Sequence, residues 1–140
     1  MAAAPEGAFM PDFDTSGLTV LGSTVRQPIE HLETFPATAT VSAVRLTSDE
    51  VGSVCPVTGQ PDLSSIEIDY RPDGQCIETK SLKLYLWSFR DRRIFAEAMA
   101  AEVAEEVWRS VRPHAVRVVV TQRPRGGIVL QATAELPVPA

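Results

Sequence analysis

Cys55 and Asp62 are the two side chains of this sequence most suited to do chemistry together. They lie seven positions apart in Cys-Pro-Val-Thr-Gly-Gln-Pro-Asp, a segment with two prolines and one glycine. A thiol attacks electrophiles as the thiolate, so it needs surroundings that lower its pKa from about 8.5. A carboxyl group donates a proton at neutral pH only where its surroundings raise its pKa from about 3.9. The segment predicts either a nucleophile with a proton donor, or a small buried side chain and a turn cap.

A second segment is unusually basic for an acidic protein. Residues 80–93 have a net charge of +4, from five basic residues against one acidic residue. Lys80 and Lys83 are three positions apart and share one face of a predicted helix. They indicate either a site for a phosphorylated ligand or a solvated charged face. Arg125 and Gly126, in Arg-Pro-Arg-Gly-Gly, add a cation to a glycine turn that is otherwise typical of a hairpin.

The composition excludes several classes of protein. The net charge of −5 and the pI near 5.0 argue against a general nucleic-acid or anionic-membrane binder. No apolar run approaches the roughly 20 residues that span a bilayer, and the first residues do not have the pattern of a secretory signal. We therefore expect a cytoplasmic protein with Cys55 and Cys76 reduced. His31 and His114 do not lie at metal-ligand spacing from a cysteine, so no metal site is expected.

The chain of 140 residues suffices for one domain. Residues 1–19 lack periodicity and are expected to form a flexible arm, which leaves 20–140 as the domain. Alternating or β-branched residues predict strands, and the apolar spacing predicts two helices. The expected order is strands at 37–47 and 65–70, helices at 80–89 and 91–112, and strands at 116–120 and 128–134, with an irregular loop at 52–62.

This order indicates an α+β fold. Two hairpins with a helical pair between them predict a four-stranded antiparallel sheet with both helices on one face, in the order ββααββ.

Three motifs in this order resemble those of the single-domain QueF-type nitrile reductases. They are Cys-Pro-x-Thr-Gly-Gln-Pro-Asp, Glu-Thr-Lys-Ser-Leu-Lys-Leu-Tyr-Leu-Trp-Ser-Phe-Arg and Pro-Arg-Gly-Gly, and the resemblance covers roughly residues 21–135. It implies the tunnelling fold and subunits that assemble into rings with active sites between them. It also implies the NADPH-dependent reduction of 7-cyano-7-deazaguanine to 7-aminomethyl-7-deazaguanine in queuosine biosynthesis, a tRNA modification pathway.

The resemblance also implies roles for particular residues. Cys55 would form a covalent thioimide with the nitrile while Asp62 protonates its nitrogen. The contacts with the deazaguanine are implied for Ile77, Glu78, Thr79, Ala96 and Glu97, where Glu97 anchors the ring. The contacts with NADPH are implied for Lys80, Lys83, Arg125 and Gly126.

One departure concerns the predicted substrate site, because Ala96 stands where family members commonly have histidine. Two alternatives therefore remain beside the reductase. One is a related transferase in which an amine attacks the same thioimide, although Lys80 and Lys83 favour a cofactor site. The other is a deazapurine-binding ring protein without catalysis.

Overall fold

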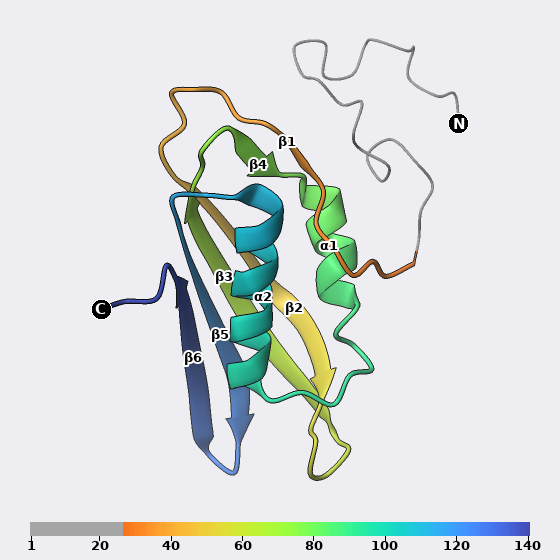
Figure 1. Ribbon diagram of the computed structural model, residues 1–140. Coiled ribbons are helices and arrows are strands. Elements are labelled where there is room, and N and C mark those ends of the chain that lie inside the picture. The colour runs from red at the N-terminus through yellow and green to blue at the C-terminus, as the bar shows by residue number, and fades with distance from the viewer. Residues whose placement is uncertain (1–26) are drawn as a thin grey trace.

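The computed structural model describes residues 27–140, so the arm predicted for residues 1–19 lies outside the described part. Four long strands form one antiparallel sheet in the order β2-β3-β5-β6 (Figure 1). They are β2 (Val44–Val54), β3 (Pro61–Arg71), β5 (Ala115–Arg125) and β6 (Ile128–Leu136). The helices α1 (Thr79–Trp87) and α2 (Ala96–Val111) lie across the same face of this sheet. The predicted α+β order ββααββ is confirmed.

The core lies between this sheet and the helices because each element buries one face. In β3, the side chains of Ile66, Ile68 and Tyr70 are buried and alternate with more exposed positions. Alternate positions of β5 and the inward face of α2 complete the layer, and Val103 and Val118 are fully buried. The same alternation places Asp62 and Ser64 among the buried side chains at the other end of β3.

The start of α1 and the end of α2 are each fixed by a capping residue. Both carboxylate oxygens of Glu78 accept hydrogen bonds from the first turn of α1, from the amides of Lys80 and Ser81, at 2.7 and 2.8 Å. The helix α2 ends at Val111, and its C-cap Arg112 adopts a left-handed conformation with φ of 52° before Pro113.

Some predicted bounds are wrong. The first long strand begins at Val44 rather than at residue 37, because Thr38 and Val41 form a turn whose carbonyl-to-amide hydrogen bond is 3.0 Å. The irregular loop is confined to residues 55–60, since β2 and β3 stay paired as far as Val54 and Pro61. The second helix begins at Ala96 rather than at residue 91.

The late start of α2 follows from a tertiary contact. The backbone of Val54 donates to the carbonyl of Arg92 at 2.9 Å and accepts from the amide of Ile94 at 3.2 Å. These hydrogen bonds hold residues 92–94 extended beside the end of β2, despite the helical composition of the segment.

Two short paired strands were not predicted, β1 (Thr34–Pro36) and β4 (Gln75–Ile77). Among the described residues, no helix is long and apolar enough to cross a membrane.

Candidate active site

Cys55 lies in the tight loop that joins β2 to β3. The loop closes on itself, because the Cys55 amide donates to the Gln60 carbonyl and the Cys55 carbonyl accepts from the Gly59 amide, each at 2.9 Å. Gly59 has φ of 72°, which glycine adopts without strain. The thiol is nearly buried, and its sulfur accepts a hydrogen bond from the Thr58 amide at 3.4 Å. The thiol predicted from the sequence is therefore held in one orientation by its own loop.

The surroundings of Cys55 favour its thiolate. Hydrogen bonds from the side chain of Thr58 and from the amides of Thr58 and Val57 lower the pKa of the thiol to about 6, and Arg125 adds to this effect. Partial burial acts in the opposite direction and is outweighed. A thiol with this pKa is mostly deprotonated at neutral pH, which is the form that attacks electrophiles.

Asp62 is the second residue of β3, and its side chain is only 3% exposed. It forms an ion pair with Arg125, whose Nη1 donates to Oδ1 of the carboxylate. Arg125 comes from the end of β5, so this contact joins two strands whose residues are 63 positions apart in sequence. Asp62 thus pairs with Arg125, which the family motifs predict to contact NADPH.

Arg125 also reaches the loop that carries the thiol. Its Nη2 lies 3.4 Å from Oγ1 of Thr58 and 3.5 Å from Oε1 of Gln60. Hydrogen bonding to Cys55 is the largest of the effects that raise the pKa of this guanidinium. Cys55 and Asp62 are therefore brought together through one shared arginine.

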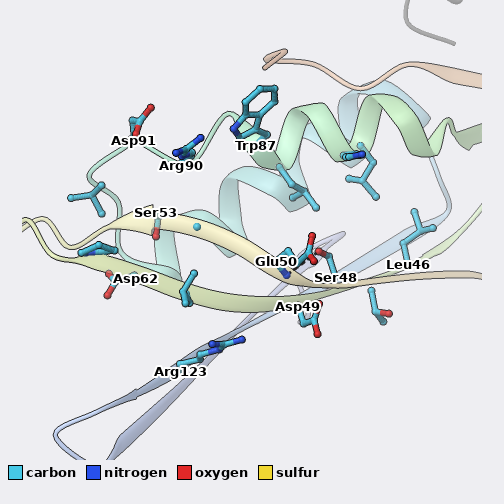
Figure 2. A pocket seen from close by; sticks show the side chains of 18 of the residues that line it. Leu46, Ser48, Asp49, Glu50, Ser53, Asp62, Trp87, Arg90, Asp91 and Arg123 are labelled. Atoms are coloured by element: carbon cyan, nitrogen blue, oxygen red, sulfur yellow. Dashed lines mark hydrogen bonds between the residues drawn. The ribbon is translucent and has the colours of Figure 1, made fainter. Parts of the chain in front are cut away.

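A cavity of about 880 Å³ lies between α1 and the β2–β3 hairpin (Figure 2). Trp87 and Arg90 line it from the helix side, and Asp62 and Arg123 line it from the strands. Lys83 of α1 also lines this cavity. The volume lies within the range of about 300–1,000 Å³ that is usual for small-molecule sites. Asp62, the predicted proton donor, and Lys83, which is predicted to contact the cofactor, therefore line the same cavity.

The segment predicted to contact the purine lines a second cavity, of about 380 Å³. Ile77, Glu78 and Thr79 all contribute to its lining. Thr79 and Leu46 line both cavities, so the two adjoin along these residues. The carboxylate of Glu78 is engaged in capping α1, so it does not extend into either cavity as an unpaired anion.

The other predicted substrate residues lie at the start of α2. Ala96 is buried, whereas Glu97 in the first turn is exposed and is not among the residues that line either cavity. The hydrogen bonds of Val54 to residues 92–94 nevertheless place this helix start beside the Cys55 loop. The guanidinium of Arg93 packs on the loop, 3.3 Å from the position that a Cβ on Gly59 would take.

The two remaining residues predicted to contact the cofactor lie at the surface or near it. Lys80, in the first turn of α1, is half-buried, and Gly126 forms the exposed turn between β5 and β6 with φ of 58°. Neither lines the larger cavity with Lys83.

Three residues of this region, Thr58, Phe95 and Arg93, were not predicted from the sequence to belong to the site. Thr58 is the main hydrogen-bond partner of the thiol, and its position three residues after Cys55 is a signal for such a turn contact. Phe95, which is 55% exposed, and Arg93 lie just before α2. No local sequence signal indicates their place beside the loop, because it depends on the contact with Val54.

Comparisons with known proteins show which family this chain resembles. The family described as QueF-like protein matches residues 61–139, which include Asp62, both helices and Arg125. A protein of Frankia casuarinae, named NADPH-dependent 7-cyano-7-deazaguanine reductase, is 43% identical over 117 residues, 84% of this chain and 94% of its own length. A protein of the same name from Alkalilimnicola ehrlichii is 41% identical over 111 residues, 78% of this chain and 86% of its own length.

A solved structure agrees as well. The crystal structure of the archaeosine synthase QueF-Like in the apo form superposes with a TM-score of 0.64 at 31% sequence identity, covering 67% of this chain and 92% of that one. The fold and the site together define a tunnelling-fold protein in which an arginine joins a thiol to a carboxyl group. The chain belongs to the QueF-like protein family.

Proposed function

We propose that this protein reduces the nitrile of 7-cyano-7-deazaguanine to the aminomethyl group with NADPH, through a covalent adduct on Cys55. The observation that carries the proposal is the lowered pKa of Cys55, about 6, in a loop whose arginine partner also holds Asp62. The names of the relatives from Frankia casuarinae and Alkalilimnicola ehrlichii supply the substrate and the cofactor.

The first step uses only groups of this chain. The Cys55 thiolate forms a bond from sulfur to the nitrile carbon, one π bond between that carbon and the nitrogen breaks, and the nitrogen takes a proton from Asp62. The product is a thioimide. Asp62, which acts in this step in its neutral, protonated form, is buried and lines the larger cavity, and this position supports its role as the donor.

The substrate is held, in this proposal, by the segment of Ile77, Glu78 and Thr79 and by the start of α2. Because the Glu78 carboxylate caps α1, its role is to fix this segment, and Glu97 is the carboxylate that accepts hydrogen bonds from the purine. Ala96, just before it, offers no polar group, so the ring is bound with one side-chain contact fewer than where histidine occupies this position.

We place the phosphorylated dinucleotide in the larger cavity, whose lining carries acidic as well as basic side chains, the acidic ones being Asp49, Glu50, Asp62 and Asp91. Lys83, Arg90 and Arg123 supply cations, and Trp87 supplies an aromatic surface, around about 880 Å³. Lys80, one turn before Lys83, extends this cationic face, and Gly126 allows close approach at the β5–β6 turn. Two NADPH molecules, bound one after the other, would each supply one of the two hydrides that take the adduct to the amine.

Assembly into rings would complete the site. Glu97 and Phe95 are exposed beside the Cys55 loop, and the outer strands β2 and β6 each have one edge without a partner strand within the described part of the chain. A neighbouring subunit on these edges would cover both residues. We place the enzyme in the cytoplasm and in queuosine biosynthesis.

The purified protein tests the proposal directly. We expect oxidation of NADPH that depends on 7-cyano-7-deazaguanine and yields two NADP⁺ for each amine. Cys55→Ala should remove this activity, whereas Cys76→Ala, which changes the other buried thiol, should keep it. If the parent binds the nitrile but oxidises no NADPH and forms no adduct, the protein is a binding protein rather than the reductase.

A second candidate is a transferase that forms an amidine from the same thioimide. The similarity to the structure titled archaeosine synthase QueF-Like favours it, and this reaction has no need of NADPH. Incubation of the nitrile compound with ammonia in the absence of NADPH separates the two. An amidine product identifies the transferase, and an adduct that awaits NADPH identifies the reductase.

A further inference from the structure

The guanidinium of Arg125 contacts three polar side chains on or beside the loop that carries the thiol. Its Nη1 donates to Asp62, and its Nη2 lies within 3.5 Å of the side chains of Thr58 and Gln60. Arg93 is the other cation that packs on the Cys55 loop, above Gly59. Of these two cations, Arg125 also contacts the carboxyl group, so it alone links the predicted nucleophile to the predicted proton donor.

The backbone explains how Arg125 reaches this position. The pairing of β5 with β6 shifts register between Gln122 and Arg125, which marks a β-bulge. Bulges redirect the side chains that follow them and are frequent beside active sites. The turn at Gly126 and Gly127, with φ of 58° and 78°, then closes the hairpin directly after Arg125. The fold thus directs this side chain towards the β2–β3 loop.

We infer that Arg125 is a positioning residue of the thiol site, which holds the Asp62 carboxyl group and the Cys55 thiolate in one orientation through a shared guanidinium. This role differs from the contact with NADPH that the resemblance implies for Arg125. Its catalytic meaning rests on the proposed function, but the arrangement itself is testable without any substrate. The direction in which Arg125 affects the thiol, towards a lower pKa, agrees with this role.

The test is the pH dependence of Cys55 alkylation by iodoacetamide in the full chain, resolved by peptide mass spectrometry. The rate reports the thiolate, so in the parent it should rise with pH to a plateau with a midpoint near 6. In Arg125→Gln we expect the midpoint to move up by a fraction of a pH unit, and in Arg125→Lys by less, because lysine keeps the positive charge but not the two-pronged donor geometry of the guanidinium.

Arg117→Gln is the matched control. Arg117 lies on the same strand, pairs with the exposed Glu135, and should leave the midpoint unchanged. An unchanged midpoint in Arg125→Gln would overturn the inference, and a raised KM for NADPH in that variant would then assign Arg125 to the cofactor. Circular dichroism checks that each variant is folded, and Arg125→Lys serves as the test if the glutamine variant is not. A shifted midpoint in a protein without reductase activity would uphold the inference while the proposed function fails.

Discussion

The carboxylates of Asp62 and Glu106 are both buried and both pair with arginine, but their surroundings differ. Asp62 is 3% exposed and pairs with Arg125, while Glu106 is 2% exposed and pairs with Arg109. Glu106 also accepts hydrogen bonds from the Leu32 amide, at 2.9 Å, and from the Ser110 hydroxyl. All of its partners join α2 to itself or to the chain before β1.

The partners of Asp62 are of another kind. Arg125, which pairs with Asp62, also interacts with the Cys55 thiol, whose pKa is lowered. The Asp62 carboxylate lines the cavity of about 880 Å³ that Lys83 also lines. A buried carboxylate with an arginine partner is therefore not by itself a sign of catalysis. What distinguishes Asp62 is the thiol of lowered pKa beside its arginine partner, whereas Glu106 accepts hydrogen bonds from a buried backbone amide and from neighbouring side chains.

The largest expected effect concerns Asp62. Asp62→Asn keeps an acceptor for Arg125 but removes the acid, so NADPH oxidation with the nitrile substrate should fall by roughly 10²- to 10⁴-fold, the usual contribution of a general acid. The free energy of unfolding should change little, which urea denaturation checks. Retention of activity within threefold would show that another group donates the proton.

A change at Glu106 should give the opposite pattern. Glu106→Met keeps the length of the side chain but leaves the Leu32 amide without its acceptor, so the free energy of unfolding should fall by about 1–3 kcal/mol. Activity per folded molecule should be retained. Glu102→Met is the matched control on the same helix, since the exposed pair with Arg92 contributes about 0–1 kcal/mol. Equal losses in both variants would contradict the role given to Glu106.

The smallest expected effect concerns Thr58, the residue of the loop that contributes most to the lowered pKa of Cys55. Thr58→Val removes the hydroxyl that contributes most to the lowered pKa of Cys55 but keeps the shape of the side chain and the amide of residue 58. The midpoint of alkylation should rise from about 6 by a fraction of a unit to roughly one unit. An unchanged midpoint would mean that the amides and Arg125 hold the thiolate without Thr58.

Local patterns were enough to predict most of the fold. The alternation from Ser65 to Tyr70 predicted β3, and the apolar spacing before Pro113 predicted the body of α2. The strands β1 and β4 were missed because each has three residues, too few for a period to be recognised. The start of α2 was misplaced because the contact of Val54 with Arg92 and Ile94 overrides the local preference for helix.

The candidate site was only partly predictable for the same reason. The spacing of Cys55 and Asp62 singled out the loop, but the contact of Arg125 with Asp62 spans 63 positions and depends on the order of the strands. No local pattern shows that Glu78 caps its helix with both oxygens or that Glu106 is buried. The roles of Glu97 and Lys80 in binding remain predictions from the family motifs.

Mass spectrometry of the intact protein tests the central claim, that Cys55 is the nucleophile, most directly. After incubation with 7-cyano-7-deazaguanine without NADPH, we predict a mass gain equal to that of the whole substrate, since addition to a nitrile expels no leaving group. Peptide mapping should locate the gain at Cys55, and Cys55→Ala should show none. An unmodified parent chain under conditions in which the nitrile is turned over with NADPH, or an adduct on Cys76, would contradict the account.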